Sequence, residues 1–397
     1  MQPMLARWFS LCACAALLLL PGLAASAAGG PDLLTRYTAP LPAPENPLAG
    51  SALEERTTLK EGVAHGDATL AFSVRVPRAW SAKTPLSLPG RTAMTDHVPE
   101  EVARWEGPVV PGGRSVLTVK TAQLPYQMTA AQWLLYESLT NSFTLEGFAP
   151  EGDRAVQAAY ITFQEGGAFA VRARAQVSGR HILVARYAVP VERREAEGAI
   201  QAATVNSFSL TNPAPGPTEA VKTHLLLDIG RFVYPASWRL SAPPVRSIDR
   251  MTATLHSLSA DGSLAGEVQL VLLSRYAGKT LAEEVEALRV KTLAARSLAL
   301  GGLISPGSEM PRAPGIQTQV VEAYAATAGQ AQEGGRPLVP HEYWFAVGVS
   351  GDYLYIATLL TPAREQHYFA WARNVETYRF ILSAFGPQEG ARAAPPG

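Results

Sequence analysis

SGRHILVA at residues 178–185 and SGDYLYIA at residues 350–357 are the stretches that decide the fold. Each begins with a Ser-Gly turn, continues through an apolar run and leads to a proline, at Pro190 and Pro362. Serine, glycine, alanine and proline fall at the same offsets in both. Because a turn this short joins only antiparallel neighbours, each stretch is predicted to belong to an antiparallel hairpin.

Other matches occur in the same order along the two halves of the chain. VPRAW at residues 76–80 corresponds to YPASW at residues 234–238, with proline three residues before tryptophan in both. Near the end of each half, NSF at residues 206–208 corresponds to LSAF at residues 382–385. The common order predicts an internal repeat, which suits a chain of 397 residues that is long enough for two hydrophobic cores.

Both copies are predicted to contain the same series of strands and helices. A helix follows the first strands and begins after an N-cap threonine, Thr129 in the first copy and Thr280 in the second. The strands expected from their apolar patterns are 70–76, 115–119, 156–164, 168–177 and 181–189, then 231–234, 268–273, 318–327, 341–349 and 353–361. A second helix closes each copy. The predicted class is α+β, with two tandem units that are each an antiparallel sheet flanked by two helices.

Proline-rich stretches divide the chain, and TAPLPAPENPLAG in the first of them has no strand or helix period, which indicates an extended, mobile segment. The expected parts are a signal peptide at 1–27, a Pro-rich leader at 28–60, a first unit at 61–211, a linker at 212–219, a second unit at 220–386 and a disordered tail at 387–397.

The N-terminal residues have the pattern of a secretory signal. Arg7 precedes an apolar run at residues 11–20, and Ala25-Ser26-Ala27 provides a small-x-small cleavage site near Ala27. The run is shorter than the ~20 residues that span a bilayer. Cys12 and Cys14 would leave with the signal, so the mature chain is expected to be cysteine-free and without disulfides. We expect a periplasmic or secreted protein with no membrane span.

Composition and motifs argue against several classes of function. The formal net charge is zero and no long basic run occurs, which excludes the electrostatic basis of nucleic-acid binding. Gly278-Lys279-Thr280 ends like a phosphate loop, but Leu273 stands where that loop needs glycine. The histidines lack metal-ligand spacing, and no Gly-x-Ser-x-Gly sequence occurs. Glu283, Glu284 and Glu286 are expected on a solvated helix face. No enzymatic activity, metal or cofactor is predicted.

Two groups of side chains are candidates for binding a partner. Arg172 and Arg174 alternate with small apolar residues and therefore share one face of a strand, and Arg186 on the next strand could join them. Protection of a wet sheet face by charge is the structural alternative. Trp344, Tyr353 and Tyr355 form an aromatic group present in the second copy only.

The element order, the early Pro-x-x-Trp and the late aromatic helix leading into a Ser/Phe strand resemble the PsbP-like superfamily. The resemblance implies tandem α/β/α sandwich units and a binding or assembly role, and it carries over no functional residue. We therefore expect a non-enzymatic exported binding or accessory protein of the bacterial envelope with a protein partner. The alternative is a protein that binds a small molecule or glycan in an aromatic cleft.

Overall fold

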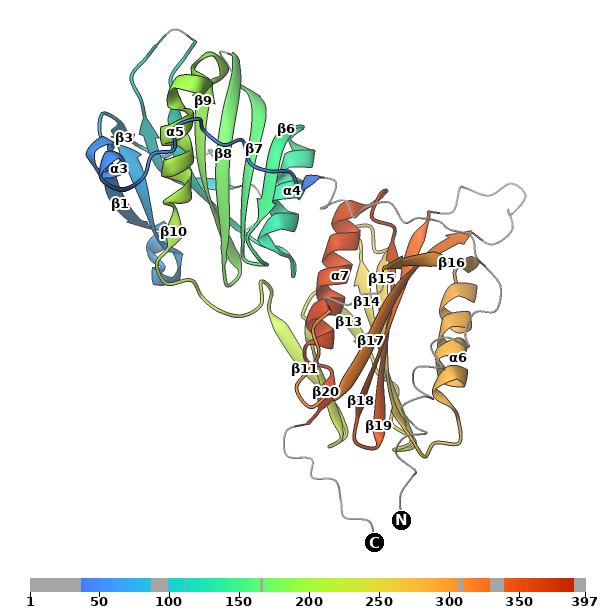
Figure 1. Ribbon diagram of the computed structural model, residues 1–397. Helices are drawn as coiled ribbons and strands as arrows, with labels where there is room; N and C mark the ends of the chain where they lie inside the picture. Colours follow the sequence, from blue (N-terminus) through green and yellow to red (C-terminus); the bar gives the residue numbers. More distant parts are fainter. Residues whose placement is uncertain are drawn as a thin grey trace, which may run out of the picture. The chain divides into compact units, whose positions relative to one another are not determined.

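The computed structural model describes residues 37–86, 99–110, 112–164, 167–305, 310–328 and 339–388. They form two compact units, a first unit that ends at Val221 and a second unit that begins at Lys222 (Figure 1). The predicted signal peptide, and the tail after residue 388, lie outside the described residues. None of the helices in the described part is long and apolar enough to cross a membrane.

The main sheet of the first unit has the strand order β3-β4-β5-β9-β8-β7-β6, and all its paired neighbours are antiparallel. Its strands are β3 (Ser81–Lys83), β4 (Glu100–Glu106), β5 (Val116–Gln123), β6 (Thr144–Pro150), β7 (Ala155–Gln164), β8 (Gly167–Ser178) and β9 (His181–Pro190). The other elements are α3 (Gly50–Arg56), α4 (Ala130–Thr140), α5 (Arg194–Asn206), and a small sheet of β1 (Thr57–Val63), β2 (Ala71–Pro77) and β10 (Ser209–Leu210). Short 3-10 turns cover Ala64–Gly66, Ala68–Leu70 and Val191–Arg193.

The second unit repeats this topology with the order β13-β14-β15-β19-β18-β17-β16. Its strands are β13 (Arg239–Ser241), β14 (Arg250–Leu258), β15 (Leu264–Ser274), β16 (Leu298–Ser305), β17 (Thr318–Ala328), β18 (His341–Ser350) and β19 (Tyr353–Pro362). Helices α6 (Leu281–Ala294) and α7 (Tyr368–Leu382) and a small sheet of β11 (Val221–Leu226), β12 (Gly230–Pro235) and β20 (Gly386–Pro387) complete it. The α+β class with two tandem sheet units is confirmed.

The first helix of each unit begins where the sequence predicts. Thr129 and Gln132 form a capping box at α4, and Thr280 and Glu283 form one at α6. Each box satisfies backbone N–H groups that a helix start leaves without partners.

The two helices of the first unit mark two faces of its main sheet, here called the α4 face and the α5 face. One hydrophobic core of the first unit lies on the α5 face, where α5 packs on β2, β8 and β9. It contains Val74, Leu117, Tyr187, Val205 and Phe208, all almost fully buried. The odd-numbered residues of β9 therefore face α5, and the even-numbered residues lie on the α4 face.

The Pro-rich leader is more ordered than its sequence indicates. Its last part forms α3 and β1, and its earlier part crosses the α5 face, seen as the blue segment before α3 in Figure 1. Ala39 pairs with Phe148 at the edge of β6, and the carbonyl of Pro42 accepts a hydrogen bond of 2.9 Å from Arg172. A Cβ on Gly147 would lie 2.8 Å from the Pro40 carbonyl oxygen, so only glycine lets the leader pass. The prediction of a mobile segment is wrong for these residues because their contacts are long-range.

The predicted linker at 212–219 lies against the first unit. Arg154 donates to the carbonyls of Ala214 and Gly216 at 2.6 and 3.1 Å, and the Ala214 N–H donates to the Ser178 hydroxyl at 2.9 Å. Thr218 is buried and its hydroxyl donates to the Tyr126 carbonyl at 2.9 Å.

Two smaller expectations are corrected. Glu284 is 1% exposed instead of solvated, because Arg250 at the start of β14 donates to its Oε1 at 2.6 and 2.9 Å. Pro387, placed in the predicted disordered tail, instead pairs with Gly230 of β12.

Candidate functional site

The strand register separates the three candidate arginines. Arg172 lies opposite Tyr187 and Arg174 opposite Ala185, whereas Arg186 lies opposite Ala173. Residues directly opposite share a face and successive residues alternate. Arg172 and Arg174 therefore lie on the α5 face and Arg186 on the α4 face. The prediction that Arg186 joins the other two is wrong, because alternation within one strand does not fix the register to the next.

Arg172 and Arg174 are engaged with the chain itself. Arg172 holds the leader through Pro42, and burial lowers the pKa of its guanidinium. Arg174 donates to Glu151 Oε2 at 2.8 Å and to the carbonyls of Asn206 and Phe208 at 2.8 and 2.9 Å. These two side chains fasten segments of the first unit together.

Two of the three candidate aromatic residues are core residues. Trp344 is 5% exposed and Tyr355 is 3% exposed, while Tyr353 is half-buried. Tyr355 packs edge-to-face on Phe385 with ring centroids 5.2 Å apart, and burial raises its pKa to about 12. The indole N–H of Trp344 donates a hydrogen bond of 3.0 Å to Oε2 of Glu342.

Glu342 is a buried carboxylate with a full set of donors. Arg364 donates through Nε to Oε1 at 2.6 Å and through Nη2 to Oε2 at 2.9 Å. The indole N–H of Trp371 donates to Oε2 at 2.9 Å, beside that of Trp344. Because its lone pairs are occupied by side chains of the same unit, this charge is a structural tie between β18 and α7.

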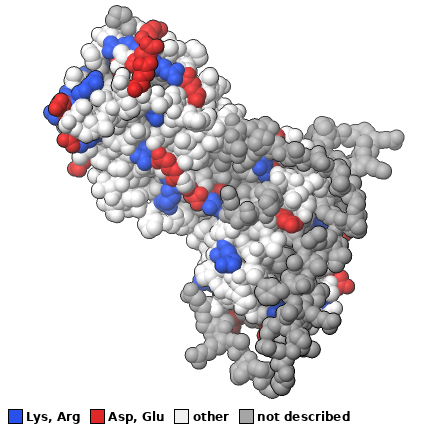
Figure 2. Space-filling model, in the orientation of Figure 1, with Lys and Arg blue, Asp and Glu red and all other residues white. Residues whose placement is uncertain are grey.

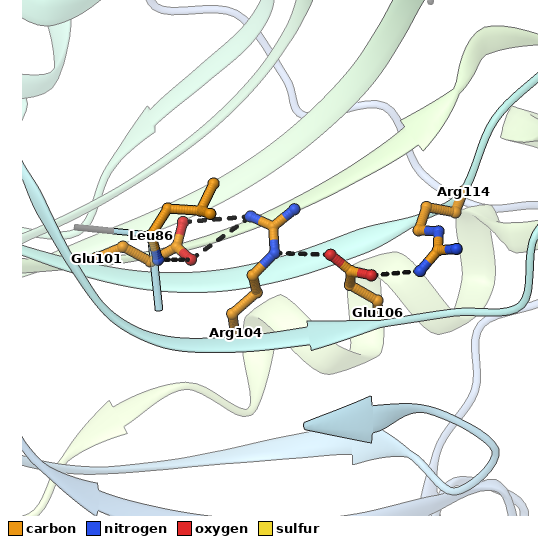
Figure 3. Close-up of polar contacts among 5 residues, drawn as sticks. All are labelled: Leu86, Glu101, Arg104, Glu106 and Arg114. Carbon is orange, nitrogen blue, oxygen red and sulfur yellow. Dashed lines mark hydrogen bonds and ion pairs between the residues drawn. The ribbon is translucent and has the colours of Figure 1, made fainter. Parts of the chain in front are cut away.

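A different kind of charge cluster lies on the α4 face of the first unit. We call it the α4-face charge network, and its members are Glu101, Arg104, Glu106, Arg114, Lys120, Glu137 and Arg186. Figure 3 shows its β4 part, in which Arg104 donates to Glu106 Oε1 at 2.8 Å and lies 3.4 Å from Glu101 Oε2. Arg114 pairs with the other oxygen of Glu106. The hydrogen bond from Arg104 is the main cause of a lowered Glu106 pKa.

Arg186 connects this network to α4. Its Nη2 lies 3.3 Å from Glu137 Oε1, its Nε donates to the Tyr160 hydroxyl at 2.8 Å, and its guanidinium lies 5.2 Å from the centre of the Phe143 ring. Burial raises the pKa of Tyr160 to about 12. The tyrosine therefore stays neutral and acts as an acceptor for the arginine.

Lys120 on β5 is the member without a partner. It lies opposite Val184 of β9 and Glu101 of β4, but its ammonium forms no hydrogen bond or ion pair with the residues that the structure describes. Burial lowers the pKa of Lys120, and the charge of Arg186 lowers it further, against the opposing effect of Glu101 and Glu137. Helix α4 packs over β6, β7 and β8, so Lys120 and Arg104 lie on the part of the face beyond it.

The second unit has mostly uncharged residues at the equivalent positions. The registers of β5 with β9 and of β15 with β19 place Lys120 at the position of Val271 and Arg186 at the position of Thr358. Counted from the helix N-caps, Glu137 corresponds to Leu288. The strand register also gives Thr252 for Glu101, Thr254 for Arg104 and His256 for Glu106. His256 lies 3.6 Å from Glu267. Val271, Leu288 and Thr358 are almost completely buried, and Val271 and Leu288 belong to one hydrophobic cluster.

Sequence reasoning missed most of this network. The sequence of β4, EEVARWE, has too few apolar residues to be predicted as a strand. Lys120 interrupts the apolar run VLTVKTAQ of β5, and that interruption is the signal that could have pointed to the site. On the face shown in Figure 2, acidic and basic atoms are interspersed, without a large patch of one sign. Within the described residues, no group of three or more His, Cys, Asp or Glu is placed to hold a metal.

No protein-family model and no curated protein matches the sequence. Three solved structures are similar at low TM-score. The first is cyanobacterial PsbP (CyanoP) from Synechocystis sp. PCC 6803, with 11% identity and TM-score 0.28, over 38% of this chain and 92% of that one. The second is the apo immunity protein TplEi of T6SS from Pseudomonas aeruginosa, with 10% identity and TM-score 0.19, over 80% and 94%. The third is the Tle4–Tli4 complex, with 11% identity and TM-score 0.18, over 79% and 95%. TM-scores this low carry no argument about family or function, and membership of the PsbP-like superfamily stays a prediction.

Proposed function

We propose that the chain is an exported, non-enzymatic binding protein of the bacterial envelope, and that the α4 face of its first unit contacts a protein partner. The observation that carries this proposal is that five members of the charge network correspond to uncharged residues in the second unit. Lys120 and Glu137 stand where the second unit has Val271 and Leu288.

Taking charged side chains out of water costs free energy. Replacing a buried ion pair by packed apolar residues is often neutral or stabilising by about 1–4 kcal/mol. The second unit demonstrates that this topology is built with valine, leucine and threonine at the same positions. The fold therefore does not require the charges of the first unit, and a binding role gives them a reason to be there.

The alternative, capture of a small molecule or glycan in an aromatic cleft, depended on Trp344, Tyr353 and Tyr355. With Trp344 and Tyr355 inside the core, only Tyr353 of that group offers a partly exposed ring. No other observation favours this alternative. The similar solved structures do not select a partner.

The test is affinity capture from an envelope extract of the source bacterium, with the full chain as bait. A transplant variant carries the second unit's residues at the network positions, namely Glu101→Thr, Arg104→Thr, Lys120→Val, Glu137→Leu and Arg186→Thr. A matched control neutralises a half-buried ion pair within α6 by Glu286→Gln and Arg289→Gln. Circular dichroism establishes that all three chains are folded.

We expect the wild type and the control to retain the same stoichiometric partner and the transplant variant to lose it. Recovery of no stoichiometric partner by the wild type would contradict the proposal. Equal recovery by the folded transplant variant would contradict the assignment of the surface.

A further inference from the structure

Lys120 is a half-buried charge that forms no hydrogen bond or ion pair with the described residues of the first unit. Charged groups that are taken out of water are normally paired, because an unpaired charge loses its hydration without compensation. Glu342 in the second unit follows that rule with donors from Arg364, Trp344 and Trp371. Lys120, which is half-buried, has no such donors or acceptors among the described residues, and only the charges of Glu101 and Glu137 favour its ammonium form.

We propose that Lys120, flanked by Arg186 and Arg104, is a binding site for a carboxylate, which in the cell is an acidic side chain of the partner protein. This inference deepens the proposed function and rests on it for the identity of the carboxylate's bearer. The site itself can be tested without the partner.

The strand register brings the three cations together from three adjacent strands. Arg104 of β4 and Arg186 of β9 both lie opposite Thr118 of β5, one on each side. Lys120 stands two residues along β5 from Thr118, on the same face, and is a diagonal neighbour of both arginines. Diagonal neighbours in a sheet lie about 7–8 Å apart, a span across which one carboxylate can receive donors from two long side chains.

The network also has unused hydrogen-bonding capacity. Nη2 of Arg186 is buried and makes no hydrogen bond, although it lies 3.3 Å from Glu137. Oε2 of Glu137 is likewise buried without a hydrogen-bond donor. An added carboxylate would accept from the ammonium of Lys120, and the charge of Arg186, which pairs with Glu137, would attract it over a longer distance.

Charge balance favours a group with one negative charge. The network sets the cations Arg104, Arg114, Lys120 and Arg186 against the carboxylates Glu101, Glu106 and Glu137, which leaves one positive charge over. Lys83 on β3 lies opposite Arg104 and adds an exposed cation at the rim. A phosphate dianion would meet the three carboxylates at close range, so a monoanionic carboxylate fits better.

The experiment observes the ε-methylene signal of Lys120 by NMR in the full chain labelled with ¹³C-lysine. The chain has six lysines, so the signal can be assigned with the single variant Lys120→Met. Sodium acetate, inorganic phosphate and sodium chloride are titrated at matched ionic strength. Lys291, which is exposed on α6, is the internal control.

We expect acetate, but not chloride, to shift the Lys120 signal saturably and to raise the Lys120 pKa by about one unit, because a bound anion favours the ammonium form. The Arg186→Thr variant should weaken acetate binding about tenfold, since it removes one charged donor. The Lys291 signal should not move.

Three outcomes would overturn the site. They are a Lys120 signal that follows ionic strength alone, acetate binding that Arg186→Thr leaves unchanged, and phosphate binding tighter than acetate binding. The two proposals fail in different ways. Acetate binding without a captured partner would refute the function and keep the site, whereas partner capture that depends on the network without acetate binding would refute the carboxylate and keep the function.

Discussion

Replacing Glu342 by leucine is expected to destabilise the second unit strongly. The substitution removes the acceptor of Arg364, Trp344 and Trp371 and leaves a guanidinium that is 7% exposed without its counter-ion. Removing one partner of a buried pair costs about 3–5 kcal/mol. For a unit of this size, that loss lowers the melting temperature by roughly 10 °C.

The double variant Glu342→Leu with Arg364→Met should recover most of this loss, because it removes both charges together. The assay is urea unfolding followed by tryptophan fluorescence, to which Trp344 and Trp371 contribute. The control is Glu286→Gln on α6, a half-buried residue that pairs with Arg289 of the same helix. The control should change the free energy of unfolding by no more than about 0.5 kcal/mol. Losses in the two single variants that simply add in the double variant would refute the reasoning.

Three further predictions concern the first unit and α6. Lys120→Met should be more stable than wild type near neutral pH, and the difference should shrink as the pH rises, as measured by urea unfolding. The folded pKa of Lys120 is below its unfolded value, so the unfolded wild type binds more protons than the folded wild type. The wild type's free energy of unfolding therefore rises with pH, which narrows the difference. A difference that grows with pH would contradict this. Gly147→Ala should release the leader at Pro40 and expose it to limited proteolysis, whereas Gly198→Ala, which has open space in α5, should leave proteolysis unchanged and add about 0.5–1 kcal/mol of stability. Equal proteolysis of the two variants would show that the glycine is not required. Thr280→Ala should lower the free energy of unfolding by about 1 kcal/mol, because it removes the N-cap of α6. Thermal unfolding measures this, and an unchanged melting temperature would argue against the capping box.

Local sequence signals were sufficient for the elements that depend on local interactions. The three long strands of each repeat are found within a residue or two of their predicted bounds, because apolar alternation and the Ser-Gly turns specify them. The N-caps Thr129 and Thr280 are found where a threonine precedes an apolar helix stripe.

Features that depend on distant partners were not predictable from these signals. The leader has no period of its own, and its order comes from Arg172 and Phe148, more than a hundred residues away. The face of Arg186 depends on the register between β8 and β9. Glu284 on helix α6 is buried and accepts hydrogen bonds from Arg250 on strand β14.

The candidate site was predictable only in part for the same reason. Arg186 was selected from the sequence, but Lys120 and Arg104 lie on strands whose apolar pattern is interrupted by the very residues that form the network. That Lys120 forms no ion pair with the described residues depends on three strands and a helix together.

Lys120 is expected to lower the stability of the first unit and to contribute to binding of the partner protein. The most direct measurement compares Lys120→Met with wild type in one set of samples, for the free energy of unfolding near neutral pH and for partner capture. We predict a variant that is more stable by about 1 kcal/mol and retains less partner. A variant that is less stable than wild type and captures as much partner would contradict the account.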